Sequence, residues 1–356
     1  MKATLMRTRV LVAVVGLAVL LAACGSSSKS GSSGGSSVTL NGAGSSFQKA
    51  FDEAAIAAFA SSNSKVTVTY NPVGSGQGKS TLQTKNSDFA GTDSLPKPGD
   101  LASYQGGALL YFPTVAAPIT VSYNLSGVSK LRLSGDTLAK IFSLKIKKWD
   151  DAAIKADNPG VTLPSTAITV ARRSDGSGTT SNFTKFLTAV DPTDWTLGSG
   201  DTVQWTSLPG TTRGGTKNAG VAQIVKTTDG AIGYVDLADA KASGLSTASI
   251  KNKSGSFVEP TVEGAAAAVA SSGVKDDLSY DPINASGATA YPITSPTWII
   301  AYEKQTSHNT GTALKDFLTF IYAQEATLAP KAGFAALPSA IVTKATAQLT
   351  KLQIPA

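Results

Sequence analysis

The chain has 356 residues, with 31 Lys and Arg, 24 Asp and Glu, one His and one Cys. Its net charge of +7 falls to +4 without residues 1–23, which hold three basic and no acidic residues. So mild a surplus, with no long basic block, argues against a nucleic-acid partner, and a single Cys excludes an internal disulfide.

The N-terminus has the pattern of an export signal. Three basic residues precede an uncharged run over 10–23 that is too short to span a bilayer. The run ends in Leu-Ala-Ala directly before Cys24, which resembles the lipobox of bacterial lipoproteins. We therefore predict a signal peptide over 1–23, and then a lipidated Cys24 with a Gly/Ser tether over 24–37. An ordinary signal peptide with an unrelated Cys is the alternative.

The body after the tether alternates helix and strand patterns. Aromatic residues and alanines recur at helical spacing over 47–59, with Ser45 or Ser46 placed to cap that helix, and a β-branched run over 66–70 predicts a strand. Such alternation predicts an α/β fold, and about 320 residues exceed one typical core, which favours two domains. Further strands are predicted over 119–123, 168–172, 231–235 and 297–302, and further helices over 136–142, 179–189, 219–227, 312–326 and 339–352.

Three loops rich in Gly, Ser and Thr each lead into a predicted helix. They span 41–47, 73–78 and 172–180. Unpaired N–H groups and the positive dipole end of a helix suit an oxyanion, and Arg173 could add a forked positive charge. Together the loops favour an anion site, although each alone is an ordinary helix start.

The second loop also contains Gly-Lys-Ser at 78–80, as a nucleotide-binding P-loop would. That motif requires a Gly at position 73, where this chain has Val73, and Gly74 is one residue too close. Together with the export signal, this spacing argues against an NTPase.

Several segments resemble the substrate-binding subunit of the bacterial phosphate-specific ABC importer, a periplasmic-binding-protein family. The stretch Arg-Arg-Ser-Asp-Gly-Ser-Gly-Thr at 172–179 is the most specific of them. The others, in chain order, lie at 42–47, 74–75, 88–93, 112–114, 145–150, 230–235 and 291–295. The sequence departs from the common pattern in Ser46, where Thr is frequent, and in Gln48, where Pro often stands.

This resemblance implies a two-lobed, type II-like α/β fold, each lobe a mixed sheet flanked by helices, joined by a two-strand hinge. Lobe I would be discontinuous, comprising 38–115 and 292–356, and lobe II would comprise 116–291. The hinge would fall near 114–116 and 291–293. Carried over by position, the phosphate-binding residues would be Ser46, Phe47, Ser75, Asp93, Arg173, Asp175, Ser177, Gly178 and Thr179.

Asp93 makes phosphate a sharper expectation than sulfate. A carboxylate repels a fully deprotonated oxyanion, but it accepts a hydrogen bond from mono- or dihydrogen phosphate, which still carry protons at neutral pH. Sulfate has no such proton, so one buried acid among many donors would discriminate against it. The alternative is that Asp93 only caps a turn over 92–94.

We therefore expect an extracytoplasmic, lipid-anchored protein that binds inorganic phosphate and delivers it to the membrane permease of an ABC importer. We expect no cofactor, no metal site and no catalytic residue. The chain has one histidine, His308, and no Gly-x-Ser-x-Gly elbow after the tether, which offers little for hydrolysis. A secreted phosphoester hydrolase, a receptor for sulfate or molybdate, and a surface sensor remain alternatives.

Overall fold

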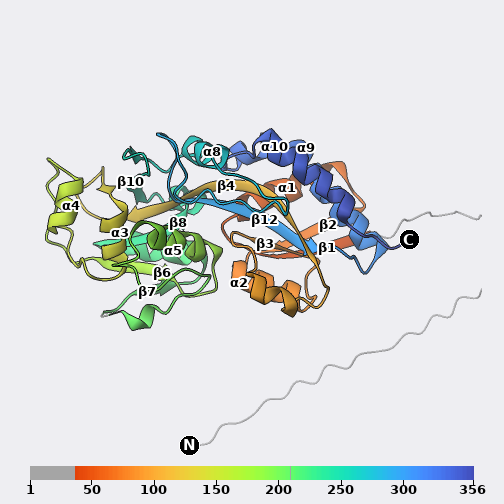
Figure 1. The fold of residues 1–356 in the computed structure, drawn as a ribbon, viewed down its shortest axis with the longest axis horizontal. Helices are drawn as coiled ribbons and strands as arrows, with labels where there is room; N and C mark the ends of the chain where they lie inside the picture. Colours follow the sequence, from red (N-terminus) through yellow and green to blue (C-terminus); the bar gives the residue numbers. More distant parts are fainter. Residues whose placement is uncertain (1–36, 209) are drawn as a thin grey trace, which may run out of the picture. The chain divides into compact units, whose positions relative to one another are not determined.

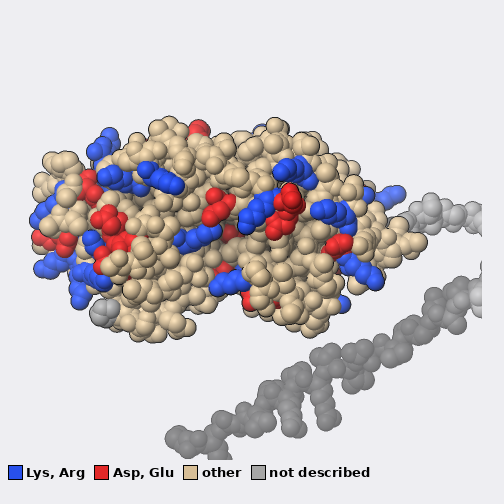
Figure 2. Space-filling view, in the orientation of Figure 1, with Lys and Arg blue, Asp and Glu red and all other residues tan. Residues whose placement is uncertain are grey.

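The structure is a computed structural model that describes residues 37–208 and 210–356. The predicted signal peptide, Cys24 and all but the last residue of the predicted tether lie outside the described residues. Within the described ranges, no helix combines the length and the apolarity that a membrane crossing requires. Basic and acidic side chains are interspersed over the face shown in Figure 2.

A nine-stranded mixed sheet runs through the described body in the order β2-β1-β3-β12-β4-β8-β6-β7, with β9 paired to β4. Strand β4 (Leu109–Tyr123) joins its two halves, because its first part pairs antiparallel with β12 (Thr294–Tyr302) and its last part with β8 (Ala231–Asp236). Figure 1 shows β4 and β12 crossing between two groups of helices, as the two-lobed prediction requires.

We call lobe I the group around β1, β2, β3 and β12. Its parallel strands β1 and β3 lie side by side, and β12 pairs antiparallel with β3. In Figure 1, α2 lies on one side of these strands, and α1, α9 and α10 on the other. Its remaining elements are β1 (Val38–Gly44), α1 (Lys49–Ser62), β2 (Val66–Asn71), α2 (Ser75–Gln83), β3 (Phe89–Thr92), α9 (His308–Lys331), α10 (Ser339–Gln348) and the 3₁₀ helices Pro98–Ser103 and Leu349–Lys351.

We call lobe II the group around β6, β7 and β8, where β6 pairs parallel with both neighbours. Its other elements are α3 (Gly135–Phe142), α4 (Ala152–Asp157), β6 (Thr169–Arg173), α5 (Gly178–Val190), the 3₁₀ helix Trp205–Ser207, β7 (Arg213–Gly215), α6 (Lys217–Thr227), α7 (Leu237–Ala242), β9 (Ser246–Thr247) and α8 (Val262–Ala270). A small sheet of β5 (Arg132–Leu133), β10 (Ser249–Lys251) and β11 (Phe257–Val258) lies apart from the main one.

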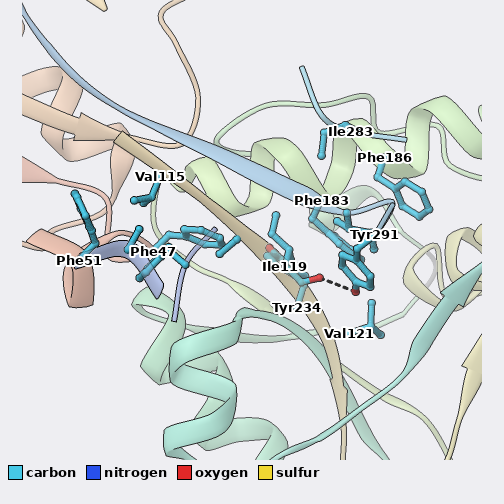
Figure 3. Close-up of a cluster of buried hydrophobic side chains, with 14 of the residues drawn as sticks. Phe47, Phe51, Val115, Ile119, Val121, Phe183, Phe186, Tyr234, Ile283 and Tyr291 are labelled. Atoms are coloured by element: carbon cyan, nitrogen blue, oxygen red, sulfur yellow. Dashed lines mark hydrogen bonds between the residues drawn. The ribbon is translucent and has the colours of Figure 1, made fainter. Parts of the chain in front are cut away.

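The hydrophobic core follows β4 from one lobe to the other (Figure 3). Val115 lies near Phe47 and Phe51, whereas Val121 lies near Tyr234 and Tyr291. Within this core the Tyr291 hydroxyl donates to the carbonyl of Ile119 over 2.9 Å. The apolar side chains buried along β4 thus form one continuous core, which stabilises both halves of the sheet.

Most predicted elements are confirmed, with three corrections. The strand predicted over 119–123 is the end of a 15-residue strand, since its two prolines, at 113 and 118, hid the earlier part. Residues 41–44 and 75–78, predicted as loop, belong to β1 and to α2, respectively. No side chain caps α1, because its N-cap is Gln48, and the Ser45 hydroxyl accepts a hydrogen bond from the Phe47 N–H instead.

Candidate anion-binding site

The lobe I side of the candidate site lies where parallel strands end. Ser45 and Ser46 directly follow β1, Asp93 directly follows β3, and Ser75 is the first residue of α2. Carboxyl ends of neighbouring parallel strands meet at one edge of a sheet, where α/β proteins place their ligands. All four residues are buried, with exposures of 1% for Ser45 and Ser75, 9% for Ser46 and 2% for Asp93.

Asp93 is the most heavily bonded carboxyl of this edge. The Ser45 hydroxyl donates to its Oδ1, the Thr179 hydroxyl donates to its Oδ2 over 3.2 Å, and its own N–H donates to the Ser75 hydroxyl over 3.3 Å. Burial raises the pKa of Asp93 to about 7, although the Ser45 hydrogen bond and the charge of Arg173 oppose that rise. Asp93 therefore exchanges a proton near neutral pH.

Lobe II contributes a cation and a helix N-terminus. Strand β6 ends at Arg173, and α5 begins at Gly178 behind its N-cap, Ser177, whose hydroxyl accepts from the Thr180 N–H over 3.1 Å. Thr179 is fully buried in the first turn. Lobe II therefore offers the free N–H groups and positive dipole end of α5 together with the guanidinium at the end of the preceding strand.

A carboxylate holds Arg173 in place. Its Nε donates to Asp175 Oδ1 over 2.8 Å, and its Nη2 donates to Oδ2. The Lys217 N–H, in a left-handed backbone with φ of 60°, also donates to Oδ1 over 3.0 Å. Burial alone would raise the pKa of Asp175, but the bonds from Arg173 outweigh it, and the pKa lies below its ordinary value. Asp175 therefore stays ionised, and the fork of Arg173 is fixed.

The lobes meet so closely at Gly74 and Gly178 that a larger residue at either position would collide with the opposite lobe. A Cβ at Gly178 would lie 2.7 Å from both the Asp93 Cβ and the Ser75 hydroxyl. Gly74 has a φ of 97°, and a Cβ there would lie 2.7 Å from Asp175 Oδ2. Any side chain at these positions would push apart the lobe I and lobe II sides of the site, which we call the two half-sites.

A polar cluster, which we call the rim clasp, joins the lobes beside the site. Lys79 of α2 lies 2.7 Å from the carboxylate of Asp201, which follows α5 in the chain. The Ser94 hydroxyl donates to the same carboxylate over 2.6 Å, and Lys79 donates to the Ser94 carbonyl over 3.1 Å. The lysine of the Gly-Lys-Ser stretch thus pairs with the opposite lobe.

The other sequence-predicted residues have mixed surroundings. Phe47 packs its ring edge-on against Phe334 in the core, while its N–H donates to Ser45. The Ser46 hydroxyl lies 3.4 Å from the Asn218 side-chain nitrogen. Gln48 donates to both oxygens of buried Asp52, a carboxyl whose pKa burial raises well above its ordinary value.

Sequence reasoning missed four side chains here, those of Ser45, Asn182, Asp201 and Asn218. Asn182 donates to the Asp93 carbonyl over 2.7 Å from inside α5, a position that no local pattern marks. Asn218 follows a Gly-Gly-Thr stretch at 214–216 that also leads into a helix. That signal, already used for three other loops, could have found it.

The arrangement combines many donors with one fully buried carboxyl, Asp93, and one fixed guanidinium. Such a set suits a small tetrahedral oxyanion that still carries a proton. Across the described ranges, no group of three or more His, Cys, Asp or Glu residues is placed to hold a metal ion.

Comparisons with known proteins agree on the family. A family profile described as a PBP superfamily domain matches residues 29–325. Phosphate-binding protein PstS of Pasteurella multocida is 37% identical over 319 residues, covering 87% of this chain and 89% of that protein. The Xylella fastidiosa 9a5c protein of the same name is 35% identical over 281 residues, covering 77% and 75%.

A solved structure has the same fold. A high-affinity periplasmic phosphate-binding protein, PfluDING, bound with phosphate, superposes with a TM-score of 0.72 at 23% identity, covering 87% of this chain and 93% of that one. The chain therefore belongs to the PBP superfamily and, within it, to the family of PstS phosphate-binding proteins.

Proposed function

We propose that this chain is an extracytoplasmic solute-binding protein that captures inorganic phosphate between its lobes and delivers it to an ABC importer. The observation that carries the proposal is Asp93, a buried carboxyl bonded by hydroxyls from both lobes and placed within the electrostatic reach of Arg173. Family membership supports the same ligand, since the relatives are named for phosphate binding.

Each residue of the proposed phosphate-binding set would have a specific role. Ser46, Ser75, Ser177 and Thr179 would donate hydroxyl hydrogen bonds, and Phe47 and Gly178 would donate from backbone N–H groups. Arg173, held by Asp175, would balance the charge of the anion, while Asp93 would accept the proton of mono- or dihydrogen phosphate. Sulfate offers no proton for that bond.

We assign lobe I to residues 38–115 and 292–356, and lobe II to 116–291. Two features support these boundaries. Strand β4 changes partner from β12 to β8 after Pro118, close to the first boundary, and β12 begins at Thr294, just beyond the second. Bending at these two strands would open the cleft for entry and release.

The N-terminal pattern supports export and attachment through a lipid on Cys24, with the permease of a phosphate importer as the partner. Replacing Cys24 with Ser should release the protein from membranes into the soluble fraction without changing phosphate affinity. If the Ser variant stays with the membranes, the anchor is elsewhere.

Titration calorimetry of the body over residues 37–356 tests the ligand. Phosphate and arsenate, which share a shape and retain a proton, should bind, whereas sulfate should bind far more weakly. Because we propose a receptor without catalysis, a chromogenic phosphoester should stay intact during incubation. Turnover of that ester, or sulfate binding as tight as phosphate, would overturn the proposal.

A further inference from the structure

Asn218 lies at the seam between the two half-sites. It is the second residue of α6 and has no solvent exposure. Its Nδ2 is 3.4 Å from the Ser46 hydroxyl of lobe I and 3.4 Å from the Thr179 hydroxyl of lobe II. Both hydroxyls belong to the proposed phosphate set, so this amide is within reach of whatever they hold.

The oxygen of the Asn218 amide lacks a hydrogen-bond donor within the described part of the chain. Among the residues that the structure describes, the buried Oδ1 of Asn218 has no hydrogen-bond partner. A buried acceptor without a donor is destabilising and uncommon in folded proteins. The position therefore favours a ligand that brings a hydrogen-bond donor of its own.

The need for a donor restricts which anions could be the ligand. A fully deprotonated tetrahedral oxyanion has only acceptor oxygens, so it cannot satisfy an amide oxygen. Monohydrogen phosphate carries one O–H group, which Asp93 can accept, and dihydrogen phosphate carries a second. A second acceptor in the site is thus useful only to an anion with more than one proton.

We propose that Asn218 is a further phosphate-contacting residue whose amide oxygen accepts a hydrogen bond from a protonated oxygen of the anion. Its nitrogen keeps the hydroxyls of Ser46 and Thr179 oriented toward the ligand. The inference rests on the proposed phosphate function and extends it, because a second acceptor would let the site pair both protons of dihydrogen phosphate.

Other charged groups around the site also bear on its pH response. Asp93 directly follows β3, Arg173 ends β6 with Asp175 two residues later, and Asp201 follows α5. Lys217 precedes Asn218 on α6 itself. All of them are shared by the wild-type protein and an Asn218 variant, so the ratio of the two affinities at each pH isolates the amide.

Calorimetry with inorganic phosphate at pH 6 and pH 8 tests the role of Asn218. Asn218→Ala should weaken binding about tenfold or more at pH 6, and clearly less at pH 8, where the anion has lost its second proton. A matched control is Asn252→Ala, because Asn252 is a buried asparagine of lobe II whose amide donates to three loop carbonyls at 287, 288 and 290. The control should lower the melting temperature and leave phosphate affinity unchanged.

Binding by Asn218→Ala within twofold of wild type at both pH values would overturn the contact, and an equal loss at both would overturn the proton preference. If the Ala variant does not fold, Asn218→Asp keeps the side-chain shape. Its carboxylate should repel the anion and weaken binding at pH 8 more than tenfold, and unchanged binding there would likewise exclude Asn218 from the ligand. Failure of wild-type protein to bind phosphate would instead overturn the proposed function.

Discussion

The two lobes place opposite kinds of group on either side of the interface between them. Lobe I supplies hydroxyls and a carboxyl, Asp93, whose pKa is raised to about 7 by burial. Lobe II supplies Arg173 and a helix N-terminus, with a carboxyl, Asp175, whose pKa lies below its ordinary value because Arg173 bonds outweigh burial. On the proposed function, we expect lobe II to provide most of the attraction for the anion and lobe I to select which anion binds.

The largest expected effect is the loss of the lobe II charge. Arg173→Ala should weaken phosphate binding by about 2–5 kcal/mol, because it leaves the anion and Asp175 without their cation. Its neighbour Arg172 provides a matched control, since its guanidinium bonds to Thr212 and lies over the Trp205 ring. In calorimetry Arg172→Ala should bind nearly normally. Near-normal affinity in the Arg173 variant would show that the site is elsewhere.

Asp93 and Asp175 should have opposite effects on how folding stability changes with pH. The pKa of Asp93 is raised from 3.8 to about 7. Its contribution to folding stability is therefore fully present below about pH 4 and is lost as pH rises through 7. The lowered pKa of Asp175 gives a contribution present above its ordinary pKa and lost as pH falls. Without phosphate, Asp93→Asn should remove a decline of as much as about 4 kcal/mol between pH 4 and pH 8.

Urea unfolding at several pH values measures this slope. Glu325, whose pKa burial raises to about 7, contributes with the same sign, so the informative quantity is the difference between wild type and Asp93→Asn. A difference that does not change between pH 4 and pH 8 would mean that Asp93 titrates normally in the folded protein.

A smaller effect concerns selectivity. Asp93→Asn should reduce the preference for phosphate over sulfate about tenfold or more, since the amide no longer repels a proton-free anion. Asp88→Asn serves as the control, because Asp88 directly precedes β3 and accepts from the Asn41 N–H at the opposite end of that strand from Asp93. Competitive titration of both anions gives the ratio. Unchanged selectivity in the Asp93 variant would show that Asp93 does not determine the preference for phosphate over sulfate.

The smallest expected effect is on the rim clasp. Lys79→Ala should speed phosphate release a few-fold, since a partly exposed ion pair contributes about 0.5–1 kcal/mol to the closed form. Lys145→Ala removes an ion pair of similar length, 2.6 Å to Asp194, within lobe II and should not change release. Stopped-flow displacement measures both rates. Equal rates in the two variants would show that the clasp does not hold the lobes together.

Local patterns accounted for much of the fold. The periodicity of apolar residues located α3, α5, α6 and β8 to within one or two residues, because those segments bury one face or lie wholly inside. The prolines of β4 concealed its length, since proline inside a strand normally marks a break. The capping role expected of Ser45 or Ser46 was wrong, because α1 begins later, behind Gln48, and the Ser45 hydroxyl accepts from the Phe47 N–H instead.

By itself, the sequence determined the alternation of helices and strands, the glycine-rich helix starts and the residue types suited to a protonated oxyanion. Only the tertiary structure decided which side chains meet across the lobes: Thr179 with Asp93, Lys79 with Asp201, and Asn218 with Ser46. The physical reason is range. Periodicity and capping act within a few residues, whereas these contacts join residues about 90 to 170 positions apart and exist only when the two lobes are packed together.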